Sequence, residues 1–165
     1  MKEQKFNQIV TENSERIKRI CRYYNDNIQD HQDMYQEILI NIWKSLDKFR
    51  GDSKLSTFIY RIAVNVSITY ANKSFKQSKL YVSADTNNIN EIIDQPQEDK
   101  AEKEKQIQQL HTALNTLSVI DKALISLVLE GLTMKEITNV IGITESNVKV
   151  KIHRIKTYLK EELSR

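Results

Sequence analysis

Six side chains near the C-terminal end have the types and the spacing needed to read DNA. On a helix they share the side opposite an apolar stripe: Ser146, Asn147, Lys149, Val150, His153 and Arg154. Arg154 can hydrogen-bond a guanine edge with both arms of its guanidinium, and Asn147 or Lys149 can donate to bases or phosphates. His153 either contacts DNA or is an exposed polar residue. The chemistry predicted for this face is hydrogen bonding in the major groove.

Two short helices with complete start signals must position this face. Thr133 and Glu136 have the spacing of a capping box. Gly142 can supply the left-handed turn after the first helix, and Thr144 can cap the second. By charge alone, an amphipathic helix with a solvated basic face is the simpler interpretation. The short helix, turn and longer helix within Thr133–Leu163 instead favour a DNA-binding helix-turn-helix.

Further helices are predicted from apolar residues at steps of three, four and seven. They cover about residues 6–24, 34–49 and 56–76 in the first half, and 107–117 and 119–131 in the second. No strand-like alternation persists, and one proline and three glycines in 165 residues are too few for a turn-rich all-β fold. The predicted fold class is all-α, with two small helical domains and a helix-turn-helix in the C-terminal one.

Charge divides the chain into three parts, although its formal net charge is only +3. Residues 1–81 carry 14 basic and 9 acidic side chains, and residues 105–165 carry 9 basic and 6 acidic ones. Residues 82–104 carry 2 basic and 7 acidic side chains and contain Pro96. This acidic stretch is predicted to be a flexible linker between two basic domains. The alternative, a surface loop of 23 residues inside one compact domain, would be unusually long.

The chain offers little for enzyme chemistry. Asp26, Asp30, Asp33 and Glu37 lie near helical spacing, but no Glu-x-x-His motif accompanies them, so an acidic face is favoured over a metal site. Phosphate-binding loops, nucleophile elbows and Cys/His pairs are missing from the sequence. We therefore predict that the protein is not an enzyme and that it needs no metal or other cofactor.

Cellular location is predicted from the same composition. The single cysteine, Cys21, excludes an internal disulfide framework. No apolar run of about 18 residues is present to span a membrane, and the first residues lack the apolar stretch of a secretion signal. We therefore expect a cytoplasmic protein.

Two motifs in the first half resemble those of a known family. The run from Phe49 to Asn65, FRGDSKLSTFIYRIAVN, resembles the promoter-melting segment of bacterial RNA polymerase sigma factors. The match is to the extracytoplasmic-function (ECF) group of the sigma-70 family, whose Asp-x-x-Gln-Glu signature resembles Asp33–Glu37. The helix-turn-helix is similar to the fourth conserved region of that group. The resemblance implies a core-binding and melting domain (1–81), a linker (82–104) and a domain for the minus-thirty-five element (105–165).

Three groups of residues acquire roles from this resemblance. Residues that dock on the clamp of the polymerase's largest subunit are Asp33, Gln36, Glu37, Ile40, Asn41 and Lys44. Residues that hold the melted minus-ten strand, including a pocket for a flipped base, are Phe49, Arg50, Gly51, Asp52, Ser53, Leu55, Arg61 and Asn65. Residues that contact the upstream (minus-thirty-five) element are Ser146, Asn147, Lys149, Val150, His153 and Arg154. Core packing is the alternative role for Phe49, Phe58 and Tyr60, and Lys73, Lys76 and Lys79 are expected near the edge of the duplex.

The resemblance implies an alternative sigma factor that directs core RNA polymerase to promoters and helps melt them. Its expected partners are core polymerase, promoter DNA and an anti-sigma factor, with no small-molecule substrate. Two other functions remain open: a helix-turn-helix regulator that acts without polymerase, and an adaptor that only binds proteins.

Overall fold

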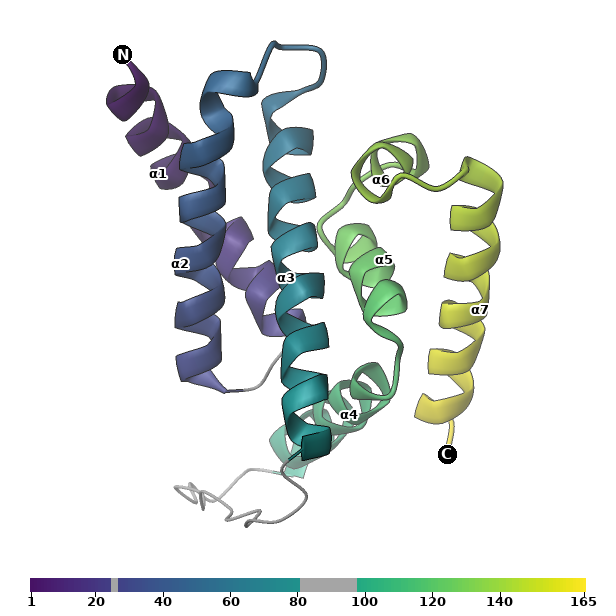
Figure 1. Cartoon of the computed structure of the whole chain (residues 1–165). Helices are drawn as coiled ribbons and strands as arrows, with labels where there is room; N and C mark the ends of the chain where they lie inside the picture. Colours follow the sequence, from purple (N-terminus) through teal and green to yellow (C-terminus); the bar gives the residue numbers. More distant parts are fainter. Residues whose placement is uncertain (25–26, 81–97) are drawn as a thin grey trace.

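The first half of the chain forms three long helices that pack side by side (Figure 1). In the computed structural model, which describes residues 1–24, 27–80 and 98–165, these are α1 (Lys2–Tyr24), α2 (Ile28–Ser45) and α3 (Leu55–Leu80). Side chains of residues 74–80 and 98–99 are outside the description. Each helix turns its apolar stripe inward, and the fully buried side chains include Ile17, Ile20, Met34, Ile38, Ile42 and Val64. The three-helix unit follows from periodic apolar residues, as predicted.

Helix α2 begins earlier than its apolar residues suggest. Asn27 caps it by accepting a hydrogen bond of 2.8 Å from the backbone N–H of Gln29, and the helix starts at Ile28 rather than near Met34. The extra first turn is largely exposed, so it has no apolar period. A short 3₁₀ helix, η1 (Leu46–Lys48), follows α2 and leads into the loop of residues 49–54.

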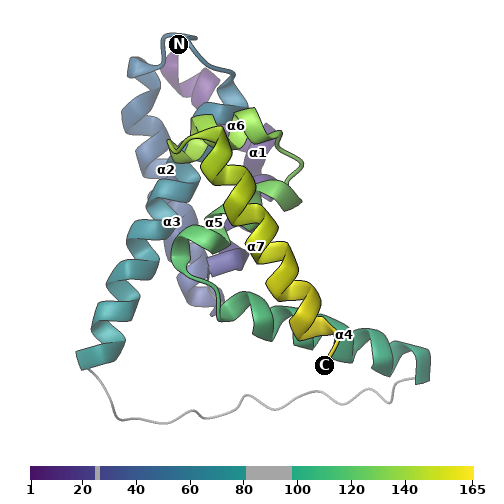
Figure 2. The same cartoon turned by 90° about the vertical axis from the view of Figure 1, so that its right-hand side faces the viewer.

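The second half of the chain forms four helices. These are α4 (Glu98–Asn115), α5 (Val119–Leu129), α6 (Met134–Ile141) and α7 (Glu145–Leu163). Helix α7 packs on α4, α5 and α6, and Figure 2 shows the lower end of α7 crossing in front of α4. The all-α fold class is confirmed, and the described residues include no strand.

The predicted caps of the helix-turn-helix are confirmed atom by atom. The Thr133 hydroxyl accepts from the Glu136 backbone N–H at 3.2 Å, and the Glu136 carboxylate accepts from the Thr133 N–H at 2.9 Å. That second bond is the main reason why the pKa of Glu136 lies below its ordinary value. Gly142 is left-handed with φ of +82°, and Thr144 caps α7 through the N–H of Asn147. Ser118 caps α5 in the same way.

We expect Thr133→Ala to lower the free energy of unfolding by about 1 kcal/mol, because the backbone N–H of Glu136 loses its acceptor. Urea unfolding followed by circular dichroism measures this change. The matched control is Thr157→Ala, in the exposed interior of α7, where alanine is the better helix former. Equal unfolding free energies for Thr133→Ala and the unmodified protein would show that the cap contributes nothing.

The predicted linker overlaps the second group of helices. Helix α4 begins at Glu98, so residues 98–104 are helical rather than linker. Their sequence, EDKAEKE, has no apolar stripe but consists mainly of good helix formers, which explains why a search for apolar periodicity misses these residues. The rest of the predicted linker, residues 82–97, lies outside the described residues.

The two groups of helices pack against each other. Helices α5 and α6 contact α3, and α5 also contacts α1, so the buried side chains of both halves form one continuous apolar core. In Figure 1, α5 and α6 lie directly beside α3. The helices of the described chain include none long and apolar enough to cross a membrane.

Cys21 lies in this core at 1% exposure, and burial raises the pKa of its thiol from about 9 to about 11. The thiolate is the reactive form, so at pH 8 the folded protein should react with a disulfide reagent at least about 100-fold more slowly than the urea-unfolded chain. The rate should rise as the pH approaches 11. Equally fast labelling of folded and unfolded protein at pH 8 would contradict this prediction. Because the chain has one cysteine, the absorbance change reports this residue alone.

Candidate nucleic-acid interface

The predicted DNA-reading residues all lie on one exposed side of α7. The opposite side is fixed by Val148, Ile152 and Ile155, which are at most 3% exposed. The left-handed turn at Gly142 sets α7 at an angle to α6, and α7 forms the right-hand edge of the molecule in Figure 1. All six residues named from the sequence are exposed. Val150 stands out as an apolar side chain with 49% exposure, which suits contact with a thymine methyl group.

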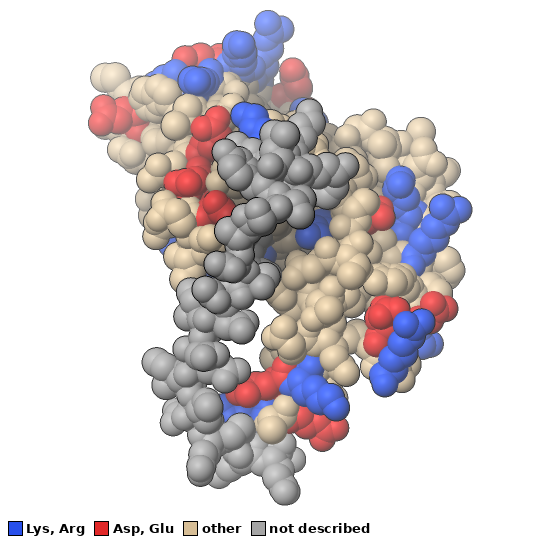
Figure 3. Space-filling model, turned by 60° about the horizontal axis from the view of Figure 1, so that its bottom comes forward, with Lys and Arg blue, Asp and Glu red and all other residues tan. Residues whose placement is uncertain are grey.

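The charges around this face are mostly basic and solvent-accessible. Lys149 pairs with Glu145 at 3.2 Å and Lys151 approaches Asp121 at 4.0 Å, whereas Arg154 has no ion pair within the described part of the chain. Lys156 and Lys160 are exposed further along the helix. In Figure 3, blue side chains project from the right-hand edge, the side of α7, with some acidic ones between them. Such a surface suits a phosphate backbone.

A second exposed face lies on α2. Five of the six predicted polymerase-docking residues are exposed, and the sixth, Asn41, is half-buried. The Asn41 amide donates to the Glu37 carbonyl at 2.8 Å and to the Glu37 carboxylate at 3.2 Å. Ile40 is 45% exposed. Trp43, one turn further on, is 39% exposed and was not singled out from the sequence. Its ring meets Phe6 edge-on at 5.2 Å, so Trp43 extends the apolar part of this face toward α1.

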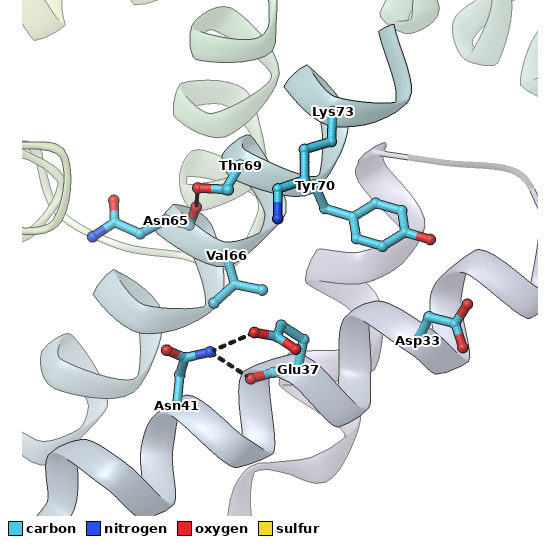
Figure 4. A pocket seen from close by; sticks show the side chains of 8 residues that line it. All are labelled: Asp33, Glu37, Asn41, Asn65, Val66, Thr69, Tyr70 and Lys73. Atoms are coloured by element: carbon cyan, nitrogen blue, oxygen red, sulfur yellow. Dashed lines mark hydrogen bonds between the residues drawn. The ribbon is translucent and has the colours of Figure 1, made fainter. Parts of the chain in front are cut away.

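A groove of about 460 Å³ runs between α2 and α3 (Figure 4). Its lining includes three residues predicted to dock on the polymerase, Asp33, Glu37 and Asn41, and one predicted to hold the melted strand, Asn65. The remaining lining residues are Val66, Thr69, Tyr70 and Lys73. The Tyr70 hydroxyl donates to Asp30 at 3.0 Å, and burial together with that bond raises the pKa of Tyr70 to about 12. Figure 4 shows the Asn65 amide pointing away from Glu37, so it faces outward from the helix pair.

The loop at the start of α3 forms a separate feature. The Phe49 ring packs on Phe58 with 4.8 Å between centroids, and Lys5 lies over the Phe49 ring at 5.5 Å. Both phenylalanines are half-buried. Arg50, Gly51 and Asp52 are exposed, and the chain turns at Gly51 with φ of +82°.

Asn65 lies further along α3 than this loop, ten residues beyond Leu55 in the same helix. Phe58, on which the Phe49 ring packs, lies seven residues before Asn65, so the two positions are about two turns apart on one side of α3. The single pocket formed by the loop and Asn65 stays a prediction. Lys73 is exposed on the same helix, and the side chains of Lys76 and Lys79 lie outside the described residues.

Two residues of the melting segment face the second half of the molecule. Tyr60 is 7% exposed and donates to the Glu130 carboxylate at 3.1 Å, so the packing role is the one observed for Tyr60. The Arg61 guanidinium donates to the Asn139 carbonyl at the end of α6, at 2.6 and 3.1 Å. Sequence patterns could not indicate these partners, because they lie 70 or more residues away.

The acidic residues of α2 do not form a metal centre within the described residues. No group of three His, Cys, Asp or Glu side chains there could hold an ion. Asp30 accepts from Tyr70 instead, and Asp26 lies outside the description.

Fold and surfaces together define an all-helical protein with a helix-turn-helix and a second exposed face on a three-helix unit. Residues 9–75 match the family model of sigma-70 region 2, and residues 107–159 match the model of sigma-70 region 4. Together these matches cover well over half of the chain, in the order predicted from the sequence. The chain belongs to the sigma-70 family of RNA polymerase sigma factors, in its ECF group.

Individual relatives agree over nearly the full length. The ECF RNA polymerase sigma factor SigW of Bacillus subtilis is 28% identical, and the alignment covers 96% of this chain and 88% of SigW. The ECF RNA polymerase sigma-E factor of Haemophilus influenzae is 24% identical over 87% of this chain and 79% of its own. Among solved structures, the sigma factor RpoE of Bartonella quintana, in complex with the anti-sigma factor NepR, shares the fold. Its TM-score is 0.73 at 19% identity, over 98% of both chains.

Proposed function

We propose that this chain is an alternative sigma factor that binds core RNA polymerase, directs it to specific promoters and helps melt them. The observation that carries the proposal is the presence, in one chain, of an exposed basic helix-turn-helix face and of an α2–α3 unit with its own exposed face. A regulator of duplex DNA needs only the first. The family assignment supports the combination.

The C-terminal part, residues 105–165, reads the upstream promoter element. Arg154, near the middle of the exposed side of α7, contacts a base edge, and Asn147 and Lys149 contact bases or phosphates in the first turns. Lys151, Lys156 and Lys160 neutralise phosphates along the same helix. Each side chain is supported by the buried stripe beneath it rather than by a flexible loop.

The N-terminal part, residues 1–81, holds the polymerase and the melted strand. The side of α2 that carries Glu37, Ile40 and Lys44 docks on the clamp of the largest subunit, where Ile40 and Trp43 can bury apolar surface. Extruding a base costs a few kcal/mol, so melting requires receptors that capture unpaired bases. The 49–55 loop and Asn65, whose amide offers a donor and an acceptor, together form a pocket that takes one flipped base.

The chain contributes binding and no catalytic group, since the polymerase makes the phosphodiester bonds. It works in the cytoplasm, where the polymerase is, and residues 82–104 connect the two DNA contacts. An anti-sigma factor is a further partner, supported by the fold shared with RpoE of Bartonella quintana, which was solved with NepR.

The proposal is tested by transcription with purified core polymerase on genomic DNA, with and without the protein, followed by sequencing of transcript 5′ ends. We expect new start sites that share two upstream sequence elements at a fixed spacing. Duplex binding without new transcripts would identify a helix-turn-helix regulator instead. Absence of any DNA dependence, with protein binding retained, would identify an adaptor.

A further inference from the structure

The start of α1 lies against the loop that is proposed to receive the flipped base. Figures 1 and 2 both show the N-terminus and the loop between α2 and α3 at the same end of the three-helix unit. The Lys5 ammonium lies 5.5 Å from the centre of the Phe49 ring, and Phe49 in turn packs on Phe58 with 4.8 Å between ring centroids. A side chain of α1 therefore reaches the loop that carries the proposed base receptor.

The charge of Lys5 is not neutralised by any carboxylate of the described chain. Lys2, three residues earlier in α1, differs in this respect: its ammonium lies 2.5 Å from the Asp47 carboxylate and 4.6 Å from the centre of the Trp43 ring. Lys5 is exposed, and its contact with the Phe49 ring takes the place of an ion pair. A lysine ammonium over the face of an aromatic ring is attracted to the ring but keeps its outward N–H donors for an anion.

Further cations surround the same ring. Lys48 and Arg50 flank Phe49 in the sequence, and both are exposed and without an ion pair in the part of the chain that the structure describes. Asp47 is already neutralised by α1, so Asp52 is the one acidic residue left in the loop of residues 49–54. Cations beside an aromatic face suit single-stranded nucleic acid, whose phosphates bind the cations while its bases stack on rings.

A flipped base brings its own phosphates to this loop. Extrusion rotates a nucleotide about its backbone, so the phosphates on either side of the base stay beside the receptor that holds it. Lys5 faces this place from a helix whose position is fixed by the buried side chains of Ile9 and Ile17, whereas Arg50 belongs to the loop itself. An ammonium suits a single phosphate of a flexible strand, because it is a point charge that does not require the planar match of a guanidinium.

We infer that Lys5 is a further contact of the melted strand: its ammonium, positioned over Phe49, binds a phosphate next to the captured base. The site for the melted strand then includes α1 as well as the loop and α3. The inference rests on the proposed function, because it adds a residue to the same site.

Lys5→Met tests this contact, because methionine keeps an unbranched side chain over the ring and removes the charge. The assay uses core polymerase and a promoter found by transcript sequencing, with permanganate reactivity as the measure of opening. We expect open-complex formation to weaken about two- to fivefold at physiological salt. The slope of log affinity against log salt should become less negative by about 0.7, the value for one phosphate of a single strand. Lys5→Arg, which keeps the charge, should retain both.

Lys18→Met is the matched control. Lys18 is also an exposed lysine of α1 that lies over an aromatic ring, Tyr35 at 6.0 Å, but it is thirteen residues away from Lys5 and pairs with Glu15 at 3.1 Å. Lys18→Met should open promoters normally and with an unchanged salt slope. The same loss in Lys18→Met and Lys5→Met would show a general effect of net charge and overturn the inference.

Three other results would also overturn the phosphate contact. Normal opening by Lys5→Met would show that the strand does not use this charge. Weaker opening with an unchanged salt slope would show that Lys5 only supports the Phe49 ring. An equally large loss of affinity for core polymerase without DNA would assign Lys5 to protein docking instead.

Failure of the proposed function gives a different pattern, in which the unmodified protein supports no polymerase-dependent transcription. The full chain alone is then tested by fluorescence anisotropy with labelled single-stranded oligonucleotides of random sequence. Binding that Lys5→Met weakens and makes less dependent on salt would support the strand contact even without polymerase. Absence of binding, or equal binding by Lys5→Met and the unmodified protein, would overturn it.

Discussion

Asn65→Ala should reduce promoter opening about 10- to 100-fold while leaving upstream-element binding within about twofold of the unmodified protein. The expected loss corresponds to the roughly 1–3 kcal/mol that one well-placed pair of hydrogen bonds to a base edge supplies. The Asn65 side chain is exposed, and its amide makes no hydrogen bond within the described residues, so its removal should not disturb α3. Permanganate reactivity of thymines in the minus-ten region measures opening, and footprinting measures upstream binding.

The matched control for Asn65→Ala is Asn72→Ala, which removes the same exposed amide two turns further along α3. It should open promoters normally. An equal loss of opening and upstream binding in Asn65→Ala would argue for a general defect rather than a lost base contact. Normal opening by Asn65→Ala would remove Asn65 from the melting surface and leave the 49–55 loop as its only proposed base receptor.

Arg154→Ala should weaken binding to the upstream element by about 1–3 kcal/mol and relax base preference at one position of that element. The reason is geometric: a guanidinium can donate two parallel hydrogen bonds to guanine, and no other side chain on the exposed side of α7 has that fork. Binding of a library of duplexes with every single substitution in the element measures both effects.

Lys156→Ala is the appropriate comparison, because Lys156 is exposed on the same helix but is assigned to the phosphate backbone. It should weaken binding to all duplexes about equally and make the logarithm of affinity less dependent on salt. If Arg154→Ala behaves in this same uniform way, Arg154 contacts phosphate rather than a base. The predicted contrast therefore separates the two kinds of contact within one helix.

Helix positions and caps were predictable because their causes are local. The capping box of Thr133 and Glu136, the left-handed Gly142 and the Thr144 cap all depend on groups within a few residues of each other, and each was confirmed. The predictions went wrong where burial was not the cause of the helix. The exposed first turns of α2 and α4 are stabilised by the Asn27 cap and by helix propensity, which leave no apolar period.

The exposed side of α7 could be predicted from the sequence, whereas the exposure of Trp43 on α2 could not. Exposure of the six residues on α7 follows from the buried stripe opposite them, and that stripe is visible in the sequence. Trp43 was missed because an aromatic residue beside an apolar stripe gives no sign of whether it is buried.

The sequence by itself determined the helices, their caps, the order of the two conserved regions and the side chains offered to DNA, because each depends on spacing of a few residues. Only the tertiary structure decided that Tyr60 is buried against the second half of the chain and that Arg61, although exposed, donates to it. Their partners, Glu130 at the end of α5 and Asn139 in α6, are far away in the sequence. Both helices have caps of their own, so no local signal points from them to α3. Such contacts depend on the shape and charge of the surfaces that the two folded groups of helices present to each other. A periodic pattern in the sequence does not encode them.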